Sequence, residues 1–164
     1  MNKEDNSKEK FKEALISTIK VISEDYKLKK NKFNNLSSNN NFFEISKLNK
    51  KEDYVKLRAE TDSEALKIKF SNEEIYKKNL PKNNSCKSLY EFSEKIRYEM
   101  LGAKMLNGIS KNLKENYSHE ISIKKKDKLN SKEDIKIEEA FEVYMLKNFL
   151  GIKLNSLSEK ILSY

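Results

Sequence analysis

The chain has 164 residues, enough for one domain that buries its own core without disulfides or a structural metal. Its formal net charge is +8, from 34 Lys and Arg against 26 Asp and Glu. No apolar run is long enough to span a bilayer and no signal peptide precedes the first helix, so we expect a cytoplasmic protein. A single cysteine, Cys86, excludes an intrachain disulfide, and a single histidine, His119, leaves little material for an imidazole metal site.

The first predicted element is an amphipathic helix from Ser7 to Asp25. Apolar side chains recur there at the spacing of one helix face, and Ser7 is placed to cap it. The period breaks between residues 26 and 48, where two apolar stretches flank the polar segment NNLSSNNN. This pattern predicts a small β-hairpin or an irregular arm.

Helical spacing returns from Lys50 to Phe70. An acid, Asp62, lies in the middle of the apolar stripe of this helix, and Arg58 lies one turn before it. A short helix from Glu73 to Lys78 is predicted next, and Pro81 with the polar residues after it ends that helix.

The segment YEFSEKIRYEMLGAKMLNGISKNL is apolar on nearly all sides of its predicted helix. A helix of this kind lies at the centre of a bundle. We therefore predict a mainly α fold, a helical bundle around one helix from about residue 88 to residue 114. Glu94, Arg97 and Glu99 would then be polar groups of an interior, where each needs a partner.

Only two arginines, Arg58 and Arg97, occur in a chain that otherwise uses lysine for its cations. A guanidinium grips a carboxylate through two parallel hydrogen bonds and tolerates partial burial. We interpret both arginines as members of a buried ionic network between two packed helices, with a contact to a partner or ligand as the alternative. A close approach of the two helices would explain Gly102 and Gly108, since each glycine costs a helix about 1 kcal/mol. The acids of the network would be Asp62, Glu94 and Glu99.

Two further helices are predicted near the end of the chain. Ser131 and Asp134 have the spacing of a capping box, and the helix that they open stops at Gly151. A last, short amphipathic helix begins with cap spacing from Ser156 to Glu159. Because so short a helix is marginal by itself, we expect the chain to be a fragment or a truncated form of a longer protein.

Two segments resemble the amino-terminal region of the CobT subunit of aerobic, ATP-dependent cobaltochelatase. In LRAETDSEALKIKFSNEEIYKKNLP, the family's motif Arg-Gly-x-Ala-Asp-Ser-x-Ala-Leu is matched at Arg58, Asp62, Ser63, Ala65 and Leu66. In the central helix, the motif Phe-Glu-x-x-Glu-x-x-Arg-x-Glu-x-x-Gly-Ala is matched at Glu91, Glu94, Arg97, Glu99, Gly102 and Ala103, with further matches at Gly108, Asn112 and Leu113.

The sequence also departs from the family's pattern. Ala59 replaces the glycine after the motif arginine, and Thr61 replaces the alanine before the aspartate. Ser71 and Asn72 stand where the family has a His-Asp pair, so the resemblance assigns no role to these two residues.

The resemblance implies an accessory subunit of the complex that inserts cobalt into hydrogenobyrinic acid a,c-diamide during cobalamin biosynthesis. That complex is a ligase that forms nitrogen–metal bonds and uses ATP, Mg and cobalt. The partners of this chain would be an AAA+ ATPase subunit and a large chelatase subunit. We expect residues 1–164 to form a single helical domain, without the von Willebrand A type domain of the family.

The residues themselves indicate an assembly module. The sequence has no phosphate-binding glycine loop, histidine cluster or cysteine pair, so we expect the isolated chain to bind neither ATP nor cobalt and to be without catalytic activity. One alternative is a module that serves an AAA+ partner in another metal-loading or remodelling task. The other is a basic helical domain that binds nucleic acid, although the lysines are spread among acids and form no recognised motif.

Overall fold

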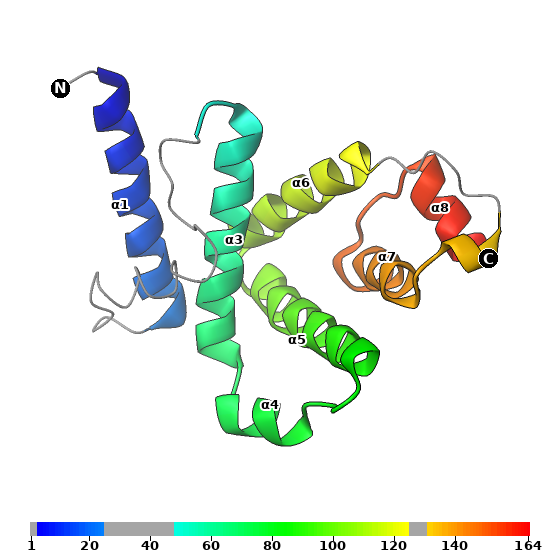
Figure 1. Ribbon diagram of the computed structural model, residues 1–164. Coiled ribbons are helices and arrows are strands. Elements are labelled where there is room, and N and C mark those ends of the chain that lie inside the picture. The colour runs from blue at the N-terminus through cyan, green and yellow to red at the C-terminus, as the bar shows by residue number, and fades with distance from the viewer. Residues whose placement is uncertain (1–2, 25–47, 125–130) are drawn as a thin grey trace. The chain divides into compact units, whose positions relative to one another are not determined.

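The computed structural model describes residues 3–24, 48–124 and 131–164. Every regular element within these ranges is a helix (Figure 1). The mainly α fold predicted from the sequence is thus confirmed. The chain divides into two compact units, Met1–Lys69 and Phe70–Tyr164, called here the first and the second unit.

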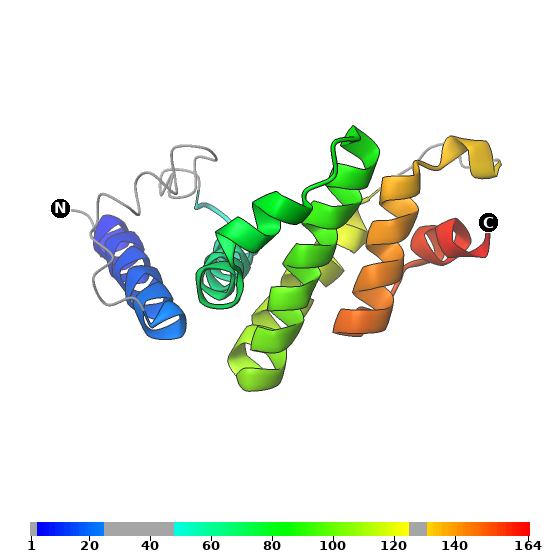
Figure 2. The same ribbon diagram turned by 90° about the horizontal axis from the view of Figure 1, so that it is seen from below.

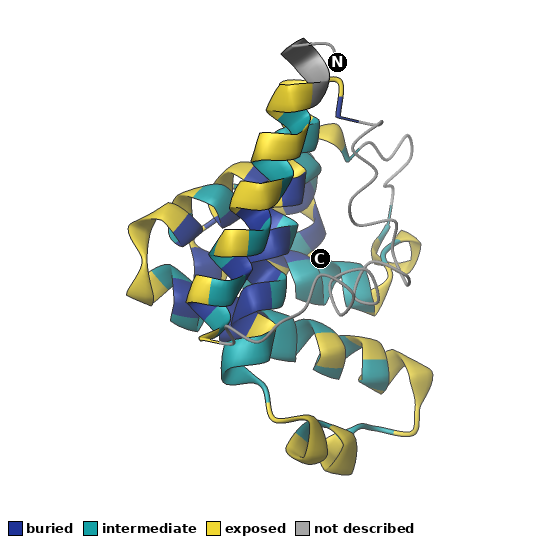
Figure 3. Ribbon diagram, turned by 90° about the vertical axis from the view of Figure 1, so that its left-hand side faces the viewer, coloured by how far each residue is buried: buried dark blue, intermediate teal, exposed yellow. Residues whose placement is uncertain are grey.

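The first unit contains two helices, α1 (Lys3–Ser23) and α3 (Lys51–Phe70), the last residue of α3 being counted with the second unit. Leu15 of α1 lies in one apolar cluster with Leu57 of α3. Buried and exposed residues alternate along α1 at the helical period (Figure 3). The predicted amphipathic helix is therefore confirmed, although it begins before Ser7.

The ends of these two helices have local causes. Glu24 adopts a left-handed backbone conformation, with φ of 59°, directly after the last residue of α1. At the start of α3, the backbone N–H groups of Asn49 and Lys50 donate to Asp53 Oδ2 over 3.0 and 2.8 Å. These hydrogen bonds lower the pKa of Asp53, so its carboxylate stays charged beside the positive end of the helix.

The arm predicted between residues 26 and 48 lies outside the described residues except at its last position. Leu48 is buried, in the same apolar cluster as Leu15. The helix predicted from Lys50 to Phe70 is confirmed, and its middle is buried on more than one side. Its buried residues are Leu57, Ala59, Thr61, Asp62, Ser63, Ala65 and Leu66.

The second unit is built around one helix. Its described α-helices are α4 (Glu73–Asn79), α5 (Asn84–Met105), α6 (Asn107–Ile123), α7 (Ile137–Leu150) and α8 (Ser156–Ser163). α5 packs against both α6 and α7, and α7 also packs against α8 (Figure 2). The position of α5 agrees with the central place predicted from its two apolar sides.

The prediction of one continuous helix from about residue 88 to residue 114 was wrong. Leu106 is extended, with φ of −136° and ψ of 118°, so α5 ends at Met105 and α6 begins at Asn107. Asn107 and Gly108 are poor formers of helix interiors but are tolerated in a first turn. Packing of the two halves against each other adds tertiary contacts that a single straight helix would lack.

Two predicted caps are displaced by a few residues. Ser131 and Asp134 do form a capping box, but this box lies at the start of the short 3-10 helix Lys132–Asp134. α7 begins only at Ile137. α8 is capped by Asn155, which accepts a hydrogen bond from the Ser158 backbone N–H over 2.8 Å. The predicted helix end at Gly151 is confirmed, with φ of 64°.

Candidate functional site

Arg97 of α5 is held in a compact clamp by one carboxylate and one backbone carbonyl. The Arg97 Nε donates to both carboxylate oxygens of Glu94, over 3.0 and 3.2 Å, and its Nη2 donates to Glu94 Oε2 over 2.9 Å. The same Nη2 donates to the Phe70 carbonyl oxygen over 2.9 Å. Arg97 therefore binds a carboxylate one turn away and also satisfies a carbonyl at the end of α3, where a cation is favoured.

This clamp is partly open to solvent. The side chain of Arg97 is 40% exposed and that of Glu94 is 23% exposed. The hydrogen bond to Glu94 raises the pKa of the guanidinium above its already high value, so the guanidinium stays charged. The predicted pairing of Arg97 with an acid is thus present within the second unit, at its surface rather than in a dry interior.

A second polar group is centred on Glu99, whose carboxylate is enclosed in the interior of the second unit. Glu99 is 0% exposed, and the Tyr117 hydroxyl of α6 donates to its Oε2 over 2.8 Å. The Lys95 Nζ lies 3.9 Å from Glu99 Oε1 and 5.4 Å from the centroid of the Tyr117 ring. One carboxylate therefore joins α5 to α6 through a hydroxyl, with an ammonium close to both.

The enclosure of Tyr117 has an electrostatic consequence. Its exposed fraction is 3%, and burial, followed by the nearby charge of Glu99, raises the pKa of its hydroxyl well above the ordinary range. The phenol therefore keeps its proton and donates a hydrogen bond to the carboxylate. With no exposed surface on Glu99, this hydrogen bond joins α5 to α6 in the interior of the second unit.

The motif charges of α3 are divided between interior and surface. Asp62 is 2% exposed, as the apolar stripe around it predicts. Arg58, one turn earlier, is exposed, and it forms no ion pair or hydrogen bond with any residue that the structure describes. The expectation that Arg58 belongs to a buried network was wrong, because its side chain is exposed and makes no ion pair within the described part of the chain.

The two motif glycines also differ. Gly102 is buried in α5. Gly108 lies in the first turn of α6, and a Cβ added there would meet no atom within 4 Å. The expectation that Gly108 permits a close approach was therefore wrong, because the break at Leu106 moves it to an exposed helix start.

Asn72 has a local role in this chain. The Asn72 side chain accepts hydrogen bonds from the backbone N–H groups of Glu74 and Ile75, both over 3.0 Å, and so caps α4. Asparagine and aspartate are about equally good in this position. The replacement of an aspartate by Asn72 thus keeps a helix cap.

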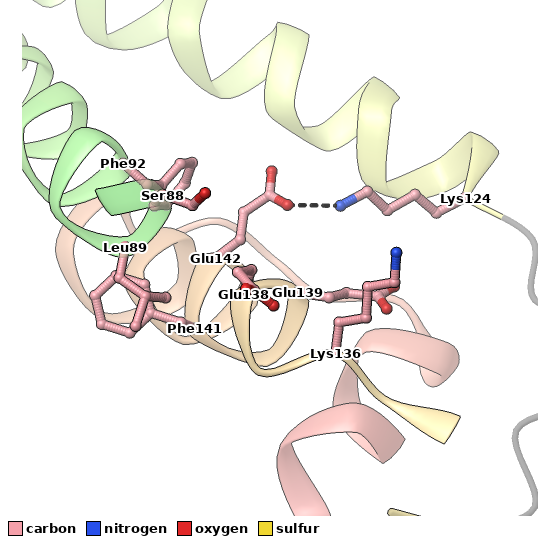
Figure 4. A pocket seen from close by; sticks show the side chains of 9 residues that line it. All are labelled: Ser88, Leu89, Phe92, Lys124, Lys136, Glu138, Glu139, Phe141 and Glu142. Atoms are coloured by element: carbon pink, nitrogen blue, oxygen red, sulfur yellow. Dashed lines mark hydrogen bonds and ion pairs between the residues drawn. The ribbon is translucent and has the colours of Figure 1, made fainter. Parts of the chain in front are cut away.

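A hollow that the sequence did not predict lies between α5 and α7, near the end of α6 (Figure 4). Its volume is about 420 Å³. Its apolar walls come from Leu89 and Phe92 of α5 and Phe141 of α7. The Lys124 Nζ crosses its rim to Glu142 Oε2 over 3.0 Å.

The rim of this hollow carries charges of both signs. Hydrogen bonds from its own backbone N–H and from the Ser85 side chain lower the pKa of Glu138, so this rim carboxylate is ionised. Lys136, at the cap of α7, also lines the rim. The arrangement would accept a small apolar group flanked by charges. No sequence spacing could have located it, because its lining comes from α5, from α7 and from Lys124 after the end of α6.

Other classes of site are not found in the described ranges. No group of three or more His, Cys, Asp or Glu side chains within residues 3–24, 48–124 and 131–164 is placed to hold a metal ion. Of the helices described, none combines the length and the apolar character that crossing a bilayer requires. Cys86 is a free, exposed thiol.

The comparisons with known proteins point to one family. The sequence model of the family described as cobalamin biosynthesis protein CobT matches residues 5–164, nearly the whole chain. No curated protein and no solved structure matches the chain.

Proposed function

Because this chain belongs to the CobT family of cobalamin biosynthesis, we propose that it serves in the cytoplasm as an assembly module of cobaltochelatase. Members of that family are part of a multi-subunit cobalt chelatase. In the proposed complex, an AAA+ ATPase subunit and a large chelatase subunit insert cobalt into hydrogenobyrinic acid a,c-diamide. The chain described here would hold these subunits together, while ATP, Mg and cobalt are used by the others.

The observation that carries the proposal is the extent of the family match, residues 5–164. The chemistry of the motif residues supports a structural part in the complex. Glu99 is enclosed and bound by Tyr117, and Arg97 is engaged by Glu94 and a backbone carbonyl. Groups that are committed to the fold in this way position surfaces for partners and are not available to transfer protons or bind a metal.

Reconstitution tests the proposal. The tagged chain is incubated with the purified ATPase subunit and, separately, with the large subunit of the same organism, and binding is measured by pull-down. Cobalt insertion into hydrogenobyrinic acid a,c-diamide is then followed by absorbance, with and without the chain, in the presence of Mg and ATP. We expect the chain to bind at least one subunit and to be inactive when incubated alone.

Two results would contradict the proposal. Failure of the chain to bind either subunit would remove its role in assembly. Cobalt insertion by the chain alone would assign to it a catalytic activity that we attribute to the complex.

A further inference from the structure

Contacts within the chain explain why residue 97 is an arginine, but they do not explain why residue 58 is one. Arg97 uses its planar fork fully, with three hydrogen bonds to Glu94 and one to the Phe70 carbonyl. A lysine could not make this set of contacts, because its ammonium is a point charge. Arg58 is exposed and makes no ion pair or hydrogen bond within the described part of the chain.

The neighbouring lysines of α3 do have acidic partners. Lys56 lies 3.8 Å from Glu60, and Lys67 lies 4.0 Å from Glu64. Lys69, near the end of the helix, pairs with Glu24. Lys56, the lysine of α3 closest in sequence to Arg58, thus has an acidic partner, whereas Arg58 has none within the described part of the chain.

The acid at the right spacing is not available to Arg58. Asp62 follows it by one turn, which is the distance at which helical ion pairs normally form. Asp62 is 2% exposed and has interactions of its own, and Arg58 is not among its partners. Tyr54 and Val55, one turn before Arg58, are half-buried and reduce the access of water to that side of the helix.

We propose that Arg58 is the residue through which α3 binds a carboxylate of a partner subunit of the chelatase, an inference that rests on the proposed function. The planar guanidinium of Arg58, beside half-buried side chains, has the geometry to bind a carboxylate through two parallel hydrogen bonds. A phosphate is a poorer match, because phosphate sites gather several unpaired cations, whereas Lys56, the lysine of α3 closest in sequence to Arg58, is paired with Glu60.

The test compares variants of the full chain for binding and for stability. Arg58→Ala, Arg58→Lys and Lys56→Ala are titrated against the purified ATPase subunit and the large subunit by bio-layer interferometry. Lys56→Ala is the matched control, since it removes an exposed cation two positions away, on a different face of the same helix. Thermal unfolding of each variant is measured in parallel.

We expect Arg58→Ala to weaken binding to one subunit by at least about tenfold and to leave the melting temperature unchanged. Arg58→Lys should recover only part of the affinity, because it restores the charge and not the fork. Lys56→Ala should bind as the unaltered chain does.

The outcomes separate this inference from the proposed function. If the unaltered chain binds and Arg58→Ala binds equally well, the assembly role stands and the assignment of Arg58 is overturned. A melting temperature lowered by Arg58→Ala but not by Lys56→Ala would also overturn it, because the arginine would then act within the chain. If the unaltered chain binds neither subunit, the proposed function fails and this inference with it.

Discussion

The two motif helices, α3 and α5, carry similar charges and use them differently. In α5 the acid three positions before Arg97 is its partner, and the acid two positions after it is buried against Tyr117. In α3 the acid one turn after Arg58 is buried and the arginine itself is exposed. Helical spacing alone thus does not make an ion pair, because the side of the helix that the fold covers decides which charges meet.

The largest effect is expected from removing the hydroxyl of α6 that binds the buried Glu99 carboxylate of α5. Tyr117→Phe leaves the Glu99 carboxylate buried without that donor, and we expect the free energy of unfolding to fall by about 2 kcal/mol. Urea denaturation measures the loss. Tyr144→Phe is the matched control, since Tyr144 is 51% exposed and should change the stability little. Equal effects of the two variants would mean that the buried hydrogen bond contributes no more than a surface hydroxyl.

Alkaline pH should reduce the contribution of the Tyr117 hydroxyl to the free energy of unfolding. Burial raises the pKa of Tyr117 in the folded chain, whereas in the unfolded chain it lies near the usual value of about 10. Stabilisation by the neutral phenol is thus fully present below about pH 10 and is lost as the pH rises further, by about 1.4 kcal/mol per pH unit.

Urea titrations from pH 8 to pH 11 measure this dependence. The difference in stability between the unaltered chain and Tyr117→Phe should be constant up to about pH 10 and then narrow. A difference that stays constant over the whole range would show that the hydroxyl ionises as easily in the folded chain as in the unfolded one.

A smaller loss of stability is expected when the partly exposed clamp around Arg97 is removed. Arg97→Ala should lower the free energy of unfolding by about 1 kcal/mol, because the pair is partly solvated and the Phe70 carbonyl loses a donor. Arg97→Lys should lose part of this amount. Arg58→Ala should change the stability by less than about 0.5 kcal/mol, as surface substitutions usually do. An equal loss of unfolding free energy in Arg97→Ala and Arg58→Ala would show that the two arginines contribute equally to stability, contrary to the difference described between α3 and α5.

The smallest effect is expected at the start of α6, and its sign is opposite. Gly108→Ala should raise the free energy of unfolding by about 0.5 kcal/mol, because alanine favours the helix and its Cβ meets no neighbouring atom. Thermal unfolding is sensitive enough to detect the gain. A loss of stability would indicate that the glycine is needed for a close contact after all.

Periodicity along the chain predicted the elements well, because it depends on local geometry. The helix from Lys50 to Phe70, the short helix from Glu73 and the helix end at Gly151 agree with the structure. Each is set by side-chain spacing, a cap or a left-handed residue that acts within one or two turns. The burial of Asp62 and Glu99 was likewise visible from the apolar residues around them.

Only the tertiary structure decided where the central segment breaks and which charges are enclosed. Leu106 belongs to an apolar stripe that would continue a helix, yet it is extended, because folding α6 back on α5 buries Leu113 and Tyr117. Tyr117 could not be assigned to Glu99 from the sequence, since the two lie on different helices. The sequence by itself determined the helices, their faces and the family motifs, all of which depend on neighbours along the chain. The partners of the charges depend on the packing of distant segments, and for this reason Arg97 lies in a clamp while Arg58 remains exposed.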